Sequence, residues 1–437
     1  MKKTGKLFTA LLLMFAVLTS YAQNVNLKSS DYNKITLNVS IGGLTAEQDG
    51  EYSVVTADGF FSSREVGKPA LPLLVKMLEI PLCDNVIVNY DLGEATVYDG
   101  ADFGALKPVM PAQPSYSKSD KTKHQFRKDD GLYATDGFYS MPAVTVEKNG
   151  ILRSVNLATL YVSPVQYNPV TNQFRIYHNI QVEITFENAD IAATKQMKKL
   201  HSNRFFPTEA FVLNPSVDDS KDSYSAPVKY LIVANSNFKG QLDNFITWKK
   251  RKGFLVEAVY TDNPNVGTTY NSIKAYIKTH YTNATPTNPA PTYVLLVGDV
   301  AQIPTQSVSS SYGSHPSDMR YFDWTGDDIP DCFFGRFSAT SESELTPQIE
   351  KTLMYEQVAM SDPSYLDEAV LIAGVENGSW YQPAFGYTHA NTAIKYTNDY
   401  YVNTTYGYST VSVFKNPHAS TATTTIKNLI KKGAGII

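Results

Sequence analysis

The chain has 437 residues, a net charge of −4 at pH 7 and two cysteines. A nearly neutral charge gives no electrostatic reason to expect a nucleic-acid partner. Two cysteines far apart in the sequence exclude a disulfide framework, and the length suits two or three domains.

The first 22 residues have the pattern of a secretory signal peptide. Three lysines precede an apolar run, and Ala22 ends a small-x-small cleavage site. A membrane anchor is the alternative, but the apolar run is too short to span a bilayer, and no later stretch qualifies. We therefore expect cleavage after Ala22. The mature protein would then be secreted or held at the cell surface, without a transmembrane segment.

Residues 23–204 are predicted to form an all-β domain. Residues 176–186 alternate with the period of two of a half-buried strand, and shorter strand-like runs cover 74–80, 85–90, 143–147 and 159–165. Turn signals such as Lys148-Asn149-Gly150 separate them. Many short strands with such turns favour a sandwich or a barrel.

A polar segment follows, basic at residues 192–204 and rich in Ser and Asp at residues 216–226. A surface loop inside one domain would have the same composition. The pattern changes completely on the far side, so we place a linker at residues 205–228.

From residue 229 to 437, predicted strands and helices alternate. Strands that are apolar on both faces and joined by helices indicate an α/β fold, with a parallel sheet covered by helices on both faces. Active sites in such sheets lie beyond the carboxyl ends of the strands. The polar residues at these positions include Asn235, Asp299 and Glu376.

The last residues predict a helix that ends at Gly433 and a buried strand that begins at Ala434. The core that this strand fills would be open without further chain. We therefore expect the domain to continue beyond Ile437, which makes residues 229–437 a truncated domain.

Five aspartates gather around one turn: Asp318, Asp323, Asp327, Asp328 and Asp331. Hard oxygen ligands on a loop suit Ca²⁺, although the spacing does not match an EF-hand. The prediction is a structural calcium ion, and a solvated loop with turn-forming aspartates is the alternative.

Glu376 follows an apolar strand and could orient a histidine, as the third member of a triad does, or could be a plain turn residue. Cys83 and Cys332 lie beside apolar residues, so neither is expected to be an activated nucleophile. The histidines show no metal-ligand spacing, and no GxSxG, P-loop or GxGxxG motif is present. From chemistry alone, these residues hold no complete catalytic set.

Residues 230–437 resemble the catalytic domain of the gingipains, a family of secreted cysteine endopeptidases with a caspase-like fold. The resemblance is carried by residues 230–233, 248–254, 293–299 and 317–338, the last of which ends in Gly335-Arg336-Phe337-Ser338. Residues 64–72 and 165–169 resemble the gingipain propeptide. The resemblance implies a zymogen whose all-β propeptide is bound to its own catalytic domain and inhibits it, and whose substrates are proteins or peptides.

The family mechanism uses a cysteine nucleophile and a histidine that protonates the leaving amine. The resemblance places both beyond residue 437, so the fragment itself is expected to be inactive, and it makes Glu376 the histidine-orienting acid. It also implies a maturation cut in the polar segment between the two domains, and we choose the basic residue Arg204 as its site. The resemblance further implies a C-terminal sorting domain. Residues 383–389 lack the S1 acid of arginine-specific gingipains, so strong arginine specificity is not expected. A non-catalytic surface or secretion protein, or a sortase-like transpeptidase on the same fold, is the alternative.

Overall fold

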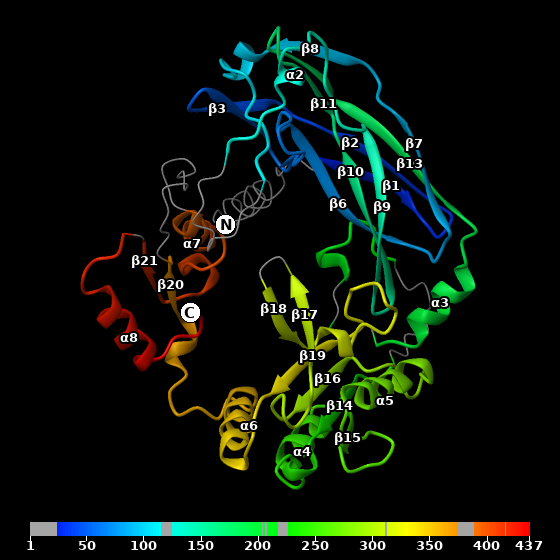
Figure 1. The fold of residues 1–437 in the computed structure, drawn as a ribbon, viewed down its shortest axis with the longest axis vertical. Coiled ribbons are helices and arrows are strands. Elements are labelled where there is room, and N and C mark those ends of the chain that lie inside the picture. Colours follow the sequence, from blue (N-terminus) through cyan, green and yellow to red (C-terminus); the bar gives the residue numbers. More distant parts are fainter. Residues whose placement is uncertain are drawn as a thin grey trace, which may run out of the picture. The chain divides into compact units, whose positions relative to one another are not determined.

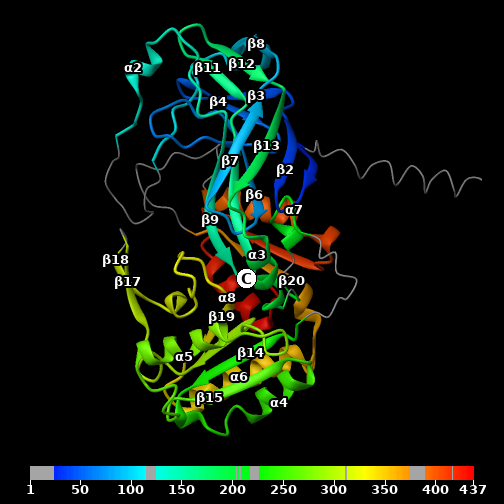
Figure 2. The same cartoon turned by 90° about the vertical axis from the view of Figure 1, so that its right-hand side faces the viewer.

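The computed structural model describes residues 24–114, 125–202, 204–205, 208–216, 226–310, 313–374, 389–415 and 417–437. The chain divides into two compact units, one of residues 1–114 with 127–342 and the other of residues 115–126 with 343–437 (Figures 1 and 2). Within the described ranges, no helix combines the length and the apolar character that crossing a membrane requires.

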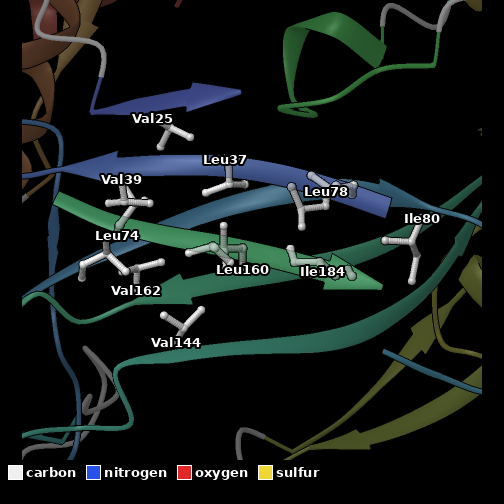
Figure 3. Close-up of a cluster of buried hydrophobic side chains, with 14 residues drawn as sticks. Val25, Leu37, Val39, Leu74, Leu78, Ile80, Val144, Leu160, Val162 and Ile184 are labelled. Atoms are coloured by element: carbon white, nitrogen blue, oxygen red, sulfur yellow. The ribbon is translucent and has the colours of Figure 1, made fainter. Parts of the chain in front are cut away.

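The N-terminal half of the first unit is a sandwich of two antiparallel sheets. One sheet has the order β1 (Val25–Ser30), β2 (Lys34–Ser40), β13 (Asn179–Glu187) and β7 (Asn85–Asp91). The other has the order β5 (Phe61–Ser62), β6 (Pro72–Ile80), β10 (Val155–Val162) and β9 (Val144–Leu152). Alternate apolar residues point inward from both sheets, as Leu37, Ile184, Leu78 and Leu160 illustrate (Figure 3). The all-β prediction is confirmed.

A third sheet and a hairpin complete this half. The sheet has the order β11 (Val165–Asn168), β12 (Gln173–Tyr177) and β8 (Ala95–Asp99), and the hairpin joins β3 (Leu44–Asp49) to β4 (Tyr52–Ala57). Two short helices, η1 (Gly100–Phe103) and α2 (Asp130–Tyr133), lie in the connections.

The prediction of a single strand at residues 176–186 was wrong. The strand is interrupted at His178, and β12 and β13 on either side of it belong to different sheets. The imidazole of His178 fixes this corner. Its Nδ1 lies 3.3 Å from the Ile41 carbonyl oxygen and its Nε2 lies 3.1 Å from the Tyr98 hydroxyl.

The turn predicted at Lys148-Asn149-Gly150 was also wrong. Strand β9 continues through these residues, and the pairing with β10 shifts there, with Gly150 opposite Leu157 and Lys148 opposite Ala158. The three residues therefore form a β-bulge. The hairpin turns instead at Arg153-Ser154, where Arg153 has a φ of 60°.

Helix α3 (Ile191–Lys199) and η2 (Thr208–Ala210) follow β13. The helix lies in the segment that the sequence analysis assigned to a polar joint; its N-cap Asp190 accepts the Ala193 amide, and Met197 is buried. Beyond residue 204, Leu213 donates its amide to the Met77 carbonyl at 2.8 Å, and the Asn214 side chain accepts from the Glu79 amide at 2.9 Å. Residues 212–216 therefore pack on the sandwich.

The second half of the first unit is a parallel sheet of order β15 (Leu255–Tyr260), β14 (Lys229–Ala234), β16 (Tyr293–Val297) and β19 (Phe333–Phe337). Helix α5 (Tyr270–Thr282) packs on one face through Ile273 and Ile277, against Leu231 and Leu296. On the other face, Phe245 of α4 (Asp243–Arg251) lies 5.6 Å from Phe337 between ring centroids. The parallel α/β sheet with helices on both faces is confirmed.

The remaining elements of this half are η3 (Ser236–Phe238), the hairpin of β17 (Gln306–Ser310) with β18 (Gly313–Ser317), and η4 (Met319–Tyr321).

The second unit contains a parallel pair, β20 (Glu368–Ile372) and β21 (Thr410–Phe414). On the other side of β20, Ile436 pairs in parallel with Ala369, and the Val370 amide donates to the Ile436 carbonyl at 2.9 Å. Strand β20 thus has a parallel neighbour on each side. The helices are α6 (Glu342–Glu356), η5 (Ser364–Asp367), α7 (His389–Tyr400), η6 (Thr404–Tyr406) and α8 (Ala422–Lys432).

Candidate active site

The carboxyl edge of the four-stranded sheet is polar. Strands β14, β16 and β19 lead into Asn235, Asp299 and Ser338, and the amide group of Asn235 donates to the Gln302 carbonyl at 3.1 Å. The Ser338 hydroxyl donates to the Asp299 carboxylate at 2.8 Å and holds its pKa below the usual value. The first unit therefore presents polar side chains where α/β enzymes place their sites.

Arg336 fixes the loop that leaves this edge. Its guanidinium makes a bidentate ion pair with Asp318, with N···O distances of 2.7 and 2.8 Å, and donates to the carbonyls of Gly298 and Ile303 at 2.7 and 3.0 Å. Gly298 has a φ of 136°, and a Cβ there would lie 2.7 Å from the Cβ of Gln302. Asp318 and Arg336 therefore hold the strand end in place.

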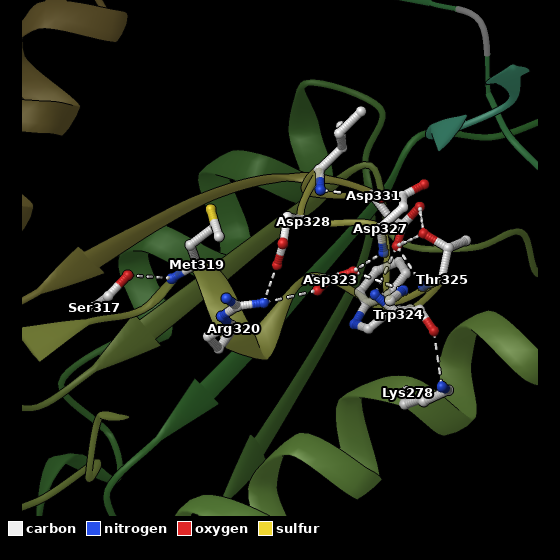
Figure 4. Close-up of polar contacts among 12 residues, drawn as sticks. Lys278, Ser317, Met319, Arg320, Asp323, Trp324, Thr325, Asp327, Asp328 and Asp331 are labelled. Carbon is white, nitrogen blue, oxygen red and sulfur yellow. Dashed lines mark hydrogen bonds and ion pairs between the residues drawn. The ribbon is translucent and has the colours of Figure 1, made fainter. Parts of the chain in front are cut away.

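Several carboxylates of the acidic loop, residues 318–331, accept hydrogen bonds from within the loop (Figure 4). Asp323 accepts the amides of Gly326 and Asp327 at 2.7 and 3.1 Å. Arg320 pairs with both Asp323 and Asp328. These contacts explain why aspartates gather here without requiring an ion.

Asp331 is fully buried, with 0% of its surface exposed, and accepts the amides of Trp324 and Thr325 at 2.6 and 3.0 Å. Burial raises the pKa of its carboxyl to about 6, although the two amide hydrogen bonds act in the opposite direction. Asp331 thus ties the end of the loop to its middle.

Calcium takes six to eight oxygen ligands that converge on one point. Within the described ranges, no three Asp, Glu, His or Cys side chains come together in a group that could hold a metal ion. The carboxylates of the loop thus form no such cluster, and calcium binding stays a prediction made from the sequence.

That prediction can be tested by melting. An ion that binds only the folded state stabilises it by mass action, so saturating CaCl₂ should raise the melting temperature of residues 24–437 while MgCl₂ at the same concentration does not. An unchanged melting temperature would mean that the acidic loop binds no calcium.

Neither cysteine is an activated nucleophile, as predicted. Cys332 is 4% exposed, and burial raises the pKa of its thiol well above the usual value. Burial also raises the pKa of Cys83. Because the thiolate is the nucleophile, a raised pKa lowers the share of each side chain that can react at neutral pH.

Of the other three predicted site residues, the structure describes Arg204 alone. Ala22 and Glu376 lie outside the described residues. Arg204 is exposed in a turn beside Phe205, and its cleavage stays a prediction. The structure thus gives the aspartates separate partners within and around one loop, and the roles of Ala22, Arg204 and Glu376 stay predictions.

His201 is a residue that the sequence analysis did not single out. It is 5% exposed, its Nδ1 lies 2.9 Å from the Met197 carbonyl oxygen, and burial lowers its pKa to about 4, a shift to which the positive charge of Arg153 also contributes. A buried histidine is held neutral here, and the basic, polar composition of residues 192–204 gave no signal of its burial.

We expect this histidine to make the chain acid-sensitive. Between pH 6.5 and pH 4 the unfolded chain would take up a proton at His201 and the folded chain would not, so stability falls as the pH falls, by up to about 3 kcal/mol. Denaturant unfolding across this range should show a smaller loss for His201→Gln than for the wild type. The exposed His315 provides the control His315→Gln, and an unchanged pH slope in His201→Gln would contradict the assignment.

Together these features define a class of protein. It has an α/β part of the kind found in enzymes, with polar residues at the carboxyl edge of a parallel sheet, preceded by an all-β domain. Residues 223–437 match the sequence model of peptidase family C25, and residues 17–212 match that of the C25 propeptide. The chain therefore belongs to peptidase family C25, as a propeptide followed by part of a catalytic domain.

The relatives include a Lys-gingipain and a gingipain R. Lys-gingipain HG66 of Porphyromonas gingivalis is 37% identical over 83% of this chain and 21% of that protein. Gingipain R2 of the same species is 28% identical over 72% of this chain and 41% of that protein. The chain thus spans about a fifth of the length of the Lys-gingipain that it matches.

A solved structure concerned with the zymogenic latency of gingipain K from Porphyromonas gingivalis is 30% identical over 39% of this chain and 97% of that chain, with a TM-score of 0.36. Membership in the family rests on the sequence matches.

Proposed function

We propose that the chain is the zymogen part of a secreted cysteine endopeptidase that cleaves proteins or peptides. Family membership over both the propeptide and the catalytic part supports this function. In the reaction, a cysteine thiolate attacks the scissile carbonyl, a histidine protonates the leaving amine, and water then hydrolyses the acyl-enzyme. Because burial raises the pKa of both Cys83 and Cys332, we assign the nucleophile and the histidine to residues that follow Ile437.

The observation that carries the proposal is the pairing around β20. Strand β20 runs parallel to β21 on one side and to the chain at Ile436 on the other, so strands continued in these directions end at the same edge of the sheet. Glu376 follows β20 in the sequence. The proposal gives the Glu376 carboxylate the role of orienting a histidine that follows Ile437, the relation of an acid to the base that it orients.

The propeptide is proposed to hold the enzyme latent and to assist its folding until it is cut away. Arg204 is our choice for the cut, supported by its exposure in a turn. Export through the signal peptide ending at Ala22 belongs to the same proposal. N-terminal sequencing of the secreted mature enzyme would begin at Phe205 if the cut falls there.

The proposed peptidase is expected to have a particular preference at the P1 position of its substrates. A guanidinium that enters a pocket without a paired carboxylate loses hydration without compensation, at a cost of about several kcal/mol. Residues 383–389 contain no acid, and the identity to Lys-gingipain HG66 exceeds that to gingipain R2. We therefore expect a profile from cleaved peptide libraries in which arginine is not the preferred P1 residue. A profile dominated by arginine would mean that another segment supplies the acid of the pocket.

A further inference from the structure

The β9–β10 hairpin, residues 144–162, leaves the propeptide sandwich and reaches the loops that flank β16 and β19, as Figures 1 and 2 both show. Its tip was expected at Lys148-Asn149-Gly150, but the bulge there lets the hairpin extend to Arg153-Ser154. The extension places propeptide residues against the catalytic part at two points.

The first contact joins the acidic loop to the hairpin backbone. The Ile151 amide donates to Oδ2 of Asp327 at 2.6 Å, and Oδ1 of the same carboxylate accepts the Ile329 amide at 3.0 Å. Gly150 has a φ of 141°, and a Cβ there would lie 2.6 Å from Oδ2 of Asp327. The carboxylate is thus oriented from its own loop, and the glycine makes room for its approach.

The second contact is the side chain of Arg153. It is 1% exposed and donates to the Ser202 carbonyl at 2.8 Å and to the Thr292 hydroxyl at 3.4 Å, and its guanidinium carbon lies 5.3 Å from the centroid of the Phe333 ring. Thr292 is fully buried next to β16, and Phe333 begins β19. One propeptide side chain therefore contacts the residue before β16, the first residue of β19 and the chain before the linker.

The conformation of the hairpin tip is energetically unfavourable in two respects. A buried arginine loses its hydration, and burial lowers the pKa of Arg153 to about 10. A positive φ at a non-glycine residue adds backbone strain. Such features persist only where the surrounding structure fixes them, here through partners 139 and 176 residues away in the sequence.

We propose that the β9–β10 hairpin is the docking element of the propeptide, and that its receptor on the catalytic part consists of Asp327 and of Thr292 and Phe333, which contact Arg153. The two points fix the hairpin by a charge-assisted hydrogen bond and by a desolvated cation, so the hairpin stays bound when the chain is cut at the joint. The acidic loop then serves to recognise the propeptide. This inference goes beyond the proposed peptidase, and its test requires no peptidase activity, so either can fail without the other.

Hydrogen exchange of the full chain tests the first contact. Asp327→Ala should raise the exchange rate of the Ile151 amide, followed in the peptide of residues 148–154, about tenfold or more, because a hydrogen bond to a charged acceptor is lost. Asp327→Asn, which keeps an acceptor oxygen, should restore most of the protection. Asp328→Ala is the matched control, since Asp328 pairs with Arg320. Equal exchange in Asp327→Ala and the wild type would overturn the contact.

The same contact can be broken from the propeptide side. Gly150→Ala should raise exchange in the same peptide, and the double variant Gly150→Ala/Asp327→Ala should add little to either single change, because both remove one interaction. Additive effects would mean that Gly150 and Asp327 act separately and would count against the receptor.

Arg153→Met tests the second contact while keeping a long side chain. It should raise exchange together in the hairpin and in residues 290–294 and 331–335, while β2 and β13 in the sandwich core stay protected. The exposed Arg64 gives the control Arg64→Met, which should change none of these peptides. If protection is lost throughout the sandwich, or in the hairpin alone, Arg153 is a folding residue of the propeptide and the docking assignment is wrong.

Discussion

Replacing Glu376 by Gln is expected to lower the turnover of the complete enzyme by one or more orders of magnitude. A carboxylate in this place holds the imidazole in its working tautomer and stabilises the imidazolium that forms during the reaction. An amide of nearly the same shape can do neither. The affinity for substrate should change less than turnover, because the role proposed for Glu376 is to orient the histidine and not to contact the scissile bond.

The measurement is steady-state kinetics on a peptide substrate, with thermal unfolding of each variant to exclude misfolding. Glu350→Gln is a suitable control, because Glu350 is an exposed carboxylate on α6. Normal turnover in Glu376→Gln would make Glu376 a turn residue and remove the third member of the proposed triad.

The second prediction with a large expected effect is that residues 24–437 alone have no peptidase activity. Residues 24–437, folded and assayed under reducing conditions against a mixed peptide library, are expected to give no turnover, because burial raises the pKa of both Cys83 and Cys332. Turnover that disappears in Cys332→Ala or Cys83→Ala would show that the nucleophile lies within these residues.

Much of the architecture could be predicted because local pattern and tertiary position agree. Strands β14 and β16 are continuous apolar runs, as buried parallel strands are, and Gly253 ends α4 with a φ of 89°. The apolar residues 370–373 likewise gave β20. In each case the pattern of neighbouring residues in the sequence is enough to predict the strand or the end of the helix.

The secondary-structure predictions were wrong where residues distant in the sequence determine the conformation. Lys148-Asn149-Gly150 has the composition of a turn, but pairing with β10 and the Asp327 carboxylate keep it inside a strand as a bulge. The run through His178 keeps its period of two although the chain changes sheets, because residues on either side of the corner are buried equally well. Neither outcome can be derived from a window of neighbouring residues.

The candidate site divides in the same way. The clustering of Asp323, Asp328 and Asp331 was visible in the sequence, but their partners were not, since backbone amides and Arg320 take the carboxylates. Arg153 gave no signal at all. Its role depends on contacts with Thr292 and Phe333, which a strained turn brings within reach.

The central claim is that this chain precedes the nucleophile of a cysteine endopeptidase. It is tested most directly by a thiol-reactive peptidyl inhibitor applied to the secreted mature enzyme, followed by mass-spectrometric mapping of the adduct. We predict one adduct, on a cysteine that follows Ile437, and loss of activity in step with labelling. An adduct on Cys83 or Cys332, or an active enzyme that carries no adduct, would contradict the account.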